Sequence, residues 1–347
     1  MSNHATVTVL GLSGIDAYPV DVDVAVSDNG HFFGVRGIAD GAARDLRVRV
    51  GAALNAAGAQ APRSVDVHLP GVGLGADLGV AVGIYCASHP SCDPRGYWAG
   101  ELGMDGSVRS VRGIASIALR ARADGQRLIL PAFDLPLARA VAPGVDAVGV
   151  CRLVDAIDLL HGRAPLQVDI ILAPAPIPNE PDFRDVRGQA DAIHAVADAV
   201  AARKPVLLVG PPGSGKSLIA HRIAGALPDL SPVVSSEVTR IYSAAGLTRP
   251  GQGAITRPPF RAPHHTIGDA ALIGGGRDLR PGEVTLAHGG VLFLDELPEF
   301  RRGVLEFLVD VLQARSVKLI RARDFVTLPA DCQLVASVWW RVIFNPS

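Results

Sequence analysis

The sequence predicts an α+β domain followed by an α/β domain, joined by a proline-rich connector, and three observations support this. The first half alternates short runs of strand-like, period-2 apolar residues with amphipathic helical stretches. Residues 173–181 then hold four prolines in nine positions, which favours a stiff, extended connector. Beyond it, an apolar run leads through a glycine-rich loop into a helix, the start of an α/β sheet. The expected parts are a first domain, a linker, a second domain and a short tail, at residues 1–165, 166–182, 183–338 and 339–347.

Composition sets the limits of the function. A chain of 347 residues allows about two domains, and its 48% hydrophobic residues are enough for packed cores. The net charge of −1 excludes a general electrostatic footprint for nucleic acid, so any basic surface must be local. Four cysteines do not make a disulfide framework, and no run has the length and apolarity of a membrane span or a secretion signal. We therefore expect a cytoplasmic protein without membrane contacts.

In the first domain, each expected element follows from a local pattern. Leu46, Val50 and Leu54 recur every four residues and predict a helix that ends near Gly58. The pair Asp105-Gly106, between two strand-like runs, predicts a hairpin turn. The remaining expected elements are a strand at 65–69, a helix from Ile114 to about Gly125, and a strand at 128–130.

The strongest signal in the sequence is a phosphate-binding loop at the start of the second domain. Glycines let the backbone direct N–H groups at phosphate oxygens, and the following helix presents its positive end to the same anion. In this motif the lysine reaches the β- and γ-phosphates, and the serine hydroxyl ligates Mg²⁺. The residues that match G-x-x-x-x-G-K-[ST] are Gly210, Pro211, Pro212, Gly213, Ser214, Gly215, Lys216 and Ser217.

A pair of acids about 80 residues later completes the predicted site. The buried-strand pattern of Val291–Leu294 ends in Asp295 and Glu296, at the edge where α/β sheets bind ligands. We expect Asp295 to hold the Mg²⁺ ion and Glu296 to deprotonate the attacking water, with Lys216 as the other catalytic residue. The alternative is that the two acids open a helix, because apolar residues follow at helical spacing from Phe300.

These residues resemble the magnesium-chelatase-related branch of AAA+ ATPases, most closely its ComM/YifB-type members. Residues 185–189 resemble the segment beside the adenine, which implies that Val186 and Gly188 contribute to nucleotide binding. The strings at 259–265, 280–290 and 295–300 also resemble the family's motifs. The resemblance implies ATP and Mg²⁺ as ligands, and a homo-oligomeric ring, typically a hexamer. For ComM-like proteins it implies DNA branch migration during natural transformation.

The first domain resembles the ribosomal-protein-S5/Lon-protease-like fold, most clearly at 100–108 and 112–113. A Ser–Lys protease dyad needs a serine nucleophile and a lysine base. The sequence has no serine between Ser64 and Ser88, holds Ala115 where the lysine is expected, and has no lysine in the whole domain. Proteolysis is therefore excluded, and we expect an assembly or substrate-binding module.

After Ser337 the sequence departs from the family pattern. Relatives continue with a sensor asparagine and a helical lid, whereas this chain reads on through Trp339 and Trp340 and stops at Ser347. We therefore expect a truncated AAA+ domain that binds ATP but hydrolyses it poorly, because sensor and lid groups stabilise charge on the γ-phosphate. Two alternatives stay open: the ATPase subunit that drives magnesium insertion into a porphyrin, and a fragment that only binds nucleotide. The long first domain argues against the chelatase subunit, whose relatives begin close to the P-loop domain.

Three weaker signals remain. The cations Arg315, Lys318, Arg321 and Arg323 lie in a predicted hairpin and could contact DNA phosphates, or could simply be a solvated edge. Cys86, His89 and Cys92 are only three ligands where structural zinc normally has four, so buried structural roles are favoured. His264 and His265 could bind a metal or a neighbouring subunit's phosphate, and a structural role is an equal alternative.

Overall fold

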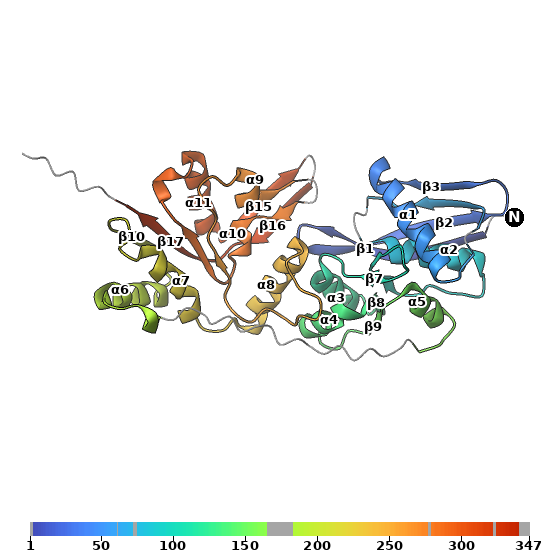
Figure 1. The fold of residues 1–347 in the computed structure, drawn as a ribbon, viewed down its shortest axis with the longest axis horizontal. Coiled ribbons are helices and arrows are strands. Elements are labelled where there is room, and N and C mark those ends of the chain that lie inside the picture. The colour runs from blue at the N-terminus through green and yellow to red at the C-terminus, as the bar shows by residue number, and fades with distance from the viewer. Residues whose placement is uncertain are drawn as a thin grey trace, which may run out of the picture. The chain divides into compact units, whose positions relative to one another are not determined.

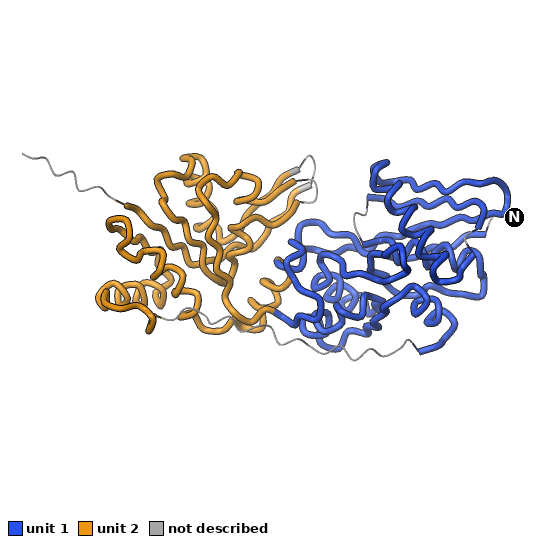
Figure 2. The backbone as a smooth tube through the Cα atoms, viewed as in Figure 1, with its two compact units in different colours: residues 1–174, 242–254 blue, residues 175–241, 255–347 orange. Residues whose placement is uncertain are grey.

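The computed structural model describes residues 3–60, 62–71, 75–164, 183–276, 279–321 and 324–339. The chain forms two compact units, shown in different colours in Figure 2. Unit 1 comprises Met1–Pro174 and Tyr242–Ala254, and unit 2 comprises Ala175–Ile241 and Ile255–Ser347. The predicted linker at 166–182 lies outside the described residues, as does the predicted tail except for Trp339.

Unit 1 is built on a seven-stranded mixed sheet (Figure 1). Two long strands form an antiparallel hairpin at its centre, and the strands beyond β1 all run parallel to it. This mixed pairing is consistent with the α+β class predicted from the alternating patterns. In sheet order the strands are β3 (Phe32–Arg36), β4 (Ser64–His68), β2 (Asp16–Ser27), β1 (Asn3–Ser13), β5 (Tyr97–Trp98), β8 (Leu128–Pro131) and β9 (Ala147–Val150).

The helices of unit 1 pack their apolar residues onto this sheet. Leu46, Val50 and Leu54 are buried in α1 (Asp40–Ala56), which confirms the predicted helical face, and the helix ends two residues before Gly58. The turn at Asp105-Gly106 is confirmed as well, because it joins the antiparallel strands β6 (Glu101–Leu102) and β7 (Val108–Arg109). The other helices are α2 (Asp77–Ser88), α3 (Ile114–Ala123), η1 (Ala132–Asp134), α4 (Leu135–Val141) and α5 (Leu153–Leu160).

Unit 2 contains a four-stranded sheet whose strands are all parallel, as the α/β prediction requires. Its order is β10 (Val206–Val209), β17 (Gln333–Val338), β14 (Val291–Leu294) and β11 (Phe260–Arg261). Val291, Phe293 and Val335 pack from the sheet against Val196 of α6 and Ile223 of α7. The helices are η2 (Phe183–Asp185), α6 (Ala190–Ala201), α7 (Lys216–Ala226), α8 (Pro232–Ala245, which ends in unit 1), α9 (Asp269–Ile273), α10 (Glu283–Leu286), η3 (Leu297–Glu299) and α11 (Arg302–Ala314).

Two small ribbons complete unit 2. One pairs β12 (Gly274–Gly275) with β13 (Arg280–Pro281). The other is the predicted basic hairpin, which pairs β15 (Ser316–Arg321) with β16 (Asp324–Pro329).

The four-stranded sheet of unit 2 gathers several loops at one edge. Because parallel strands all end at the same edge of a sheet, the loops after β10, β11, β14 and β17 lie there.

Residues 242–254 depart from the predicted contiguous boundary of the second domain, because they group with unit 1. Hydrogen bonds explain this placement. The amide of Gly113 donates to the carbonyl of Ser243 (2.9 Å), the amide of Ala115 donates to its hydroxyl (3.2 Å), and the amide of Gly251 donates to the carbonyl of Phe133 (2.8 Å). The first turn of α3 therefore obtains its partners from a segment more than 100 residues away, which no local pattern predicts.

Candidate functional site

The glycine-rich loop follows β10 and opens α7. Gly213 has φ 77° and Gly215 has φ 88°, values at which a side chain would be strained, so glycine is required at both positions. The amide of Gly210 donates to the carbonyl of Val338 on the neighbouring strand (3.3 Å), which ties the start of the loop to the sheet. The loop thus lies at the carboxyl edge of the sheet, against the N-terminus of a helix.

Lys216 and Ser217 form the first turn of α7 and face different partners. The Nζ of Lys216 donates to the carbonyls of Gly210 and Pro211, both at 2.9 Å, so the ammonium group lies over the loop. The Oγ of Ser217 donates to Oδ2 of Asp295 at 3.1 Å. Two predicted site residues that are 78 positions apart in the chain are therefore in direct contact.

The acids follow β14 directly and are held by the adjacent strand. Leu294 pairs with Ala336, so the next residues, Asp295 and Ser337, lie side by side. The buried hydroxyl of Ser337 donates to Oδ1 of Asp295 and accepts a hydrogen bond from the amide of Glu296 (3.0 Å). Glu296 has φ 55°, an unusual backbone conformation of the kind that concentrates at functional sites. The acids do not open the long helix, because η3 intervenes and α11 begins only at Arg302.

Sequence analysis missed Ser337 as a site residue. Its signal was its position, since it is the polar residue within the otherwise apolar stretch Leu334–Val338, near the end of a parallel strand. The oxygens of Ser217 and Asp295 meet at this edge, and hydroxyl and carboxylate oxygens are ligands that Mg²⁺ prefers. The residues present therefore fit the predicted metal.

The segment predicted to lie beside the adenine is linked to the loop. The amide of Val186, which is half-buried, donates to the carbonyl of Phe183 (3.0 Å), and the exposed Gly188 has φ 72°. The side-chain amide of Gln189 donates to the carbonyl of Ser214 at 2.5 Å. Gln189 is a second residue that sequence analysis did not select. Its hydrogen bond places the segment next to the phosphate loop.

The weaker candidates have structural partners. Burial raises the pKa of the Cys86 thiol to about 12, which disfavours the thiolate that binds metals. The ring of His89 stacks on that of Tyr85 with centroids 4.2 Å apart. Across the described residues, His, Cys, Asp and Glu side chains do not gather in groups of three or more that could hold a metal ion. The rings of His264 and His265 contact each other at a tilt of 33° at the carboxyl edge of the sheet in unit 2.

The basic hairpin exposes one face. Val317, Leu319, Val326 and Leu328 are buried, whereas Lys318, Ile320 and Phe325 are exposed. Arg315, at the base of the hairpin, forms a 3.7 Å ion pair with Asp331. Arg323 and the side chain of Arg321 lie outside the described structure.

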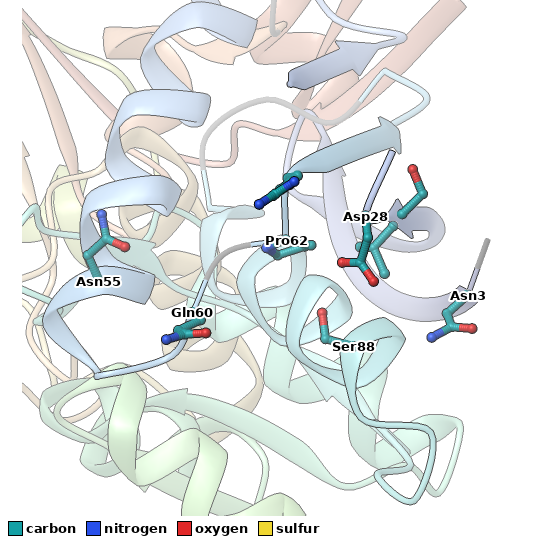
Figure 3. Close-up of a pocket in the computed structure, with 9 residues that line it drawn as sticks. Asn3, Asp28, Asn55, Gln60, Pro62 and Ser88 are labelled. Carbon is teal, nitrogen blue, oxygen red and sulfur yellow. The ribbon is translucent and has the colours of Figure 1, made fainter. Parts of the chain in front are cut away.

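Unit 1 has an open hollow of about 550 Å³. Figure 3 shows it between the open end of the β1–β2 hairpin, which contributes Asn3 and Asp28, and the C-terminal ends of α1 and α2, which contribute Asn55 and Ser88. Its lining is mostly polar but contains neither a glycine-rich phosphate loop nor an acid pair like those of unit 2. Among the described helices, none combines the length and the apolarity that crossing a bilayer requires.

A parallel sheet with this loop, helix and acid pair defines the class of P-loop α/β proteins. The family model "Magnesium chelatase, subunit ChlI" matches residues 182–340, and the model "Subunit ChlI of Mg-chelatase" matches residues 20–134. The chain belongs to this magnesium-chelatase-related family, and it is ComM/YifB-like.

Curated relatives support this assignment along most of the chain. An uncharacterized protein of Mycobacterium tuberculosis is 37% identical over 337 residues, or 94% of this chain and 67% of the relative. The competence protein ComM of Haemophilus influenzae is 32% identical over 348 residues (96% and 67%), and YifB of Escherichia coli is 32% identical over 352 residues (96% and 66%). The chain thus spans about two thirds of the length of these relatives. A shorter match, 31% over 148 residues (40% and 26%), is to Lon protease 2 of Bacillus subtilis.

Proposed function

We propose that the chain binds Mg-ATP at residues 210–217 and hydrolyses it as a ComM-like, DNA-remodelling motor. The observation that carries the proposal is the 3.1 Å hydrogen bond between Ser217 and Asp295, which joins the phosphate loop to the acid pair. Membership of a family of ATPase subunits supports the nucleotide, and the name of the competence protein ComM supports a role in DNA uptake.

In this proposal each residue has one task. ATP binding exchanges the two hydrogen bonds from Lys216 to loop carbonyls for contacts with the β- and γ-phosphates. Ser217 and Asp295 would hold Mg²⁺, which when bound neutralises phosphate charge. Glu296, whose backbone is fixed by Ser337, orients the attacking water and accepts its proton. Val186, Gly188 and the loop residues surround the nucleotide.

The hairpin is the proposed DNA contact. Lys318 is exposed beside Ile320 and Phe325, which form a cross-strand pair and are 78% and 77% exposed. A cation next to exposed apolar surface fits phosphate attraction combined with stacking of bases. The further proposals are a homo-oligomeric ring, a cytoplasmic location, and an assembly or substrate-binding role for the S5/Lon-like unit 1.

Nucleotide binding is tested with Lys216→Ala. Losing the charged donor is expected to weaken the affinity for a fluorescent ATP analogue by about 100-fold, measured by titration. The matched control is Lys204→Ala, an exposed lysine of the same unit, which should bind like the wild type. Equal affinity in both variants would refute the proposal. ATP turnover by the wild type that is lost in Lys216→Ala would support hydrolysis at this site, and a high rate would overturn only the poor turnover expected from the sequence. Binding without turnover would favour the nucleotide-binding-only alternative.

DNA contact is tested with Lys318→Ala. Loss of one phosphate contact should weaken binding to forked DNA of any sequence and reduce the slope of log affinity against log salt by about 1. Thr327→Ala, at the cross-strand partner of Lys318, is the control. Unchanged affinity and slope in Lys318→Ala would remove the hairpin from the proposal.

The description of the matching family favours a second candidate, the ATPase subunit of a magnesium chelatase. Stimulation of ATP turnover by a chelatase partner with porphyrin would support this candidate, whereas stimulation by forked DNA would support the first.

A further inference from the structure

Strand register brings a histidine beside the proposed catalytic base. β11 runs parallel to β14 with Phe260 opposite Val291 and Arg261 opposite Leu292, an offset of 31 positions (291 − 260). Continued past both strand ends, the same offset places residue 265 opposite residue 296. The structure follows this extrapolation, because Nδ1 of His265 lies 3.8 Å from Oε2 of Glu296.

The His265 ring is itself held in place. It contacts the ring of His264 at a tilt of 33°, with centroids 4.1 Å apart, and it meets Phe300 edge-on at 6.5 Å. His264 is in turn fixed by Thr266, whose amide donates to its Nδ1 (3.3 Å). The His265 imidazole is only 28% exposed and has little room to swing away from the acid.

Glu296 is therefore approached from two sides. Ser337, on the β17 side, fixes its backbone, whereas its side chain is 47% exposed and retains its own torsional freedom. His265, on the β11 side, is a titratable side chain that faces this carboxylate, and the His264 ring lies against it at a tilt. At 3.8 Å the two groups are not hydrogen-bonded, but a small rotation of either side chain would bring the imidazole within hydrogen-bond distance of the carboxylate.

We propose that His265 is a positioning residue that aims the Glu296 carboxylate at the attacking water. The inference rests on the proposed function, since it needs Glu296 as the base. His265 does not touch the phosphate loop in the described contacts, so it should influence the rate of hydrolysis and not the affinity for nucleotide. A structural role alone would instead lower stability and affinity together.

The contact is tested by imidazole NMR of histidine-labelled protein, with the His265 signals assigned by their loss in His265→Asn. Glu296→Gln removes the charge, and the His265 resonances are expected to shift more than those of the remaining histidines. Unmoved His265 resonances would overturn the inference and leave the proposed function intact.

The role is tested by single-turnover hydrolysis with protein in excess over ATP. His265→Ala should lower the rate about tenfold, because a misaimed base loses part of its effective concentration, with nucleotide affinity within about twofold of the wild type. His265→Asn should recover part of the rate, since it restores a polar group. His68→Ala, an exposed histidine on β4 in unit 1, is the control.

The outcomes separate the two proposals. If Glu296→Gln hydrolyses ATP like the wild type, or the wild type does not hydrolyse ATP at all, the proposed function fails and the positioning role with it. If Glu296→Gln is inactive while His265→Ala keeps the wild-type rate, only the positioning role fails. A rate loss in His265→Ala that is matched by lost affinity, and not recovered by asparagine, would also overturn it.

Discussion

Two buried serines in this molecule accept a backbone N–H in the same way, yet they serve opposite purposes. In unit 2, Ser337 accepts from Glu296 and donates to Asp295, and both acids are exposed. In unit 1, Ser243 accepts from Ala115, which is buried at the start of α3. The first serine holds groups that face solvent and that are proposed to face a ligand, whereas the second completes the interior. The exposure of the partners separates a site from a scaffold here.

The acids show the same contrast. Asp77 of unit 1 is 1% exposed, and its carboxylate accepts from both Arg49 (2.7 and 3.1 Å) and the amide of Leu102 (3.2 Å). Asp295 of unit 2 is exposed and bonded only to hydroxyls in the described structure. A carboxylate that is already neutralised supports the fold, while one that keeps its charge toward solvent can hold a cation.

Asp77→Ala gives the largest expected effect. Removing the acid leaves Arg49 and the amide of Leu102 without their buried partner, and we expect the free energy of unfolding of unit 1 to fall by about 3 kcal/mol. Chemical denaturation measures it. The control is Asp66→Ala, which breaks an exposed ion pair with Arg36 and should cost about 0.5 kcal/mol. Equal losses in the two variants would contradict the distinction drawn for Asp77.

The second prediction concerns the buried carboxyl group of Asp134, which is only partly hydrogen-bonded. Burial raises its pKa to about 6, although Ser110 donates to one oxygen, and the other oxygen has no partner in the described structure. The folded state thus binds the proton more tightly than the unfolded chain, so stability should fall as pH rises from about 4 to about 6 and then level off. Asp134→Asn should remove this slope and gain about 2 kcal/mol at pH 7. Chemical denaturation at several pH values measures this dependence of stability on pH. The same dependence in Asp134→Asn and in the wild type would contradict the inference.

Replacing Ser337 or Ser243 by alanine should give the smallest effects, each on a single property of the protein. Ser337→Ala removes a hydrogen bond from each acid, and we expect ATP hydrolysis to slow by about tenfold while nucleotide affinity changes little. Single-turnover rates measure this.

Ser243→Ala is its matched counterpart. It leaves the buried amide of Ala115 without its acceptor and should lower the stability of unit 1 by about 1 kcal/mol without changing hydrolysis. If both serine variants lost stability alone, Ser337 would belong to the scaffold, and the contrast between the two regions would disappear.

Several elements of this fold could be predicted from the sequence, because they depend on local periodicity, but the long β1–β2 hairpin at the centre of unit 1 was not among them. The spacing of Leu46, Val50 and Leu54 marks α1, and the apolar run before Gly210 marks β10. The loop and the acid pair were also selected from sequence, because each chemistry requires particular residue types at a fixed short spacing. Helix starts carry less signal in this sequence, because neither α1 nor α11 begins with a side-chain cap.

The amino-acid sequence alone predicted several of the helices and strands, the phosphate-binding loop, and the acid pair proposed to serve it. Only the tertiary structure decided that Ser337 and His265 flank Glu296, that Gln189 reaches the loop, and that Ser243 belongs to unit 1. The physical reason is that these neighbours are set by strand register and chain crossings over tens to hundreds of positions. A shift of one residue in register would place different side chains together without altering any local pattern.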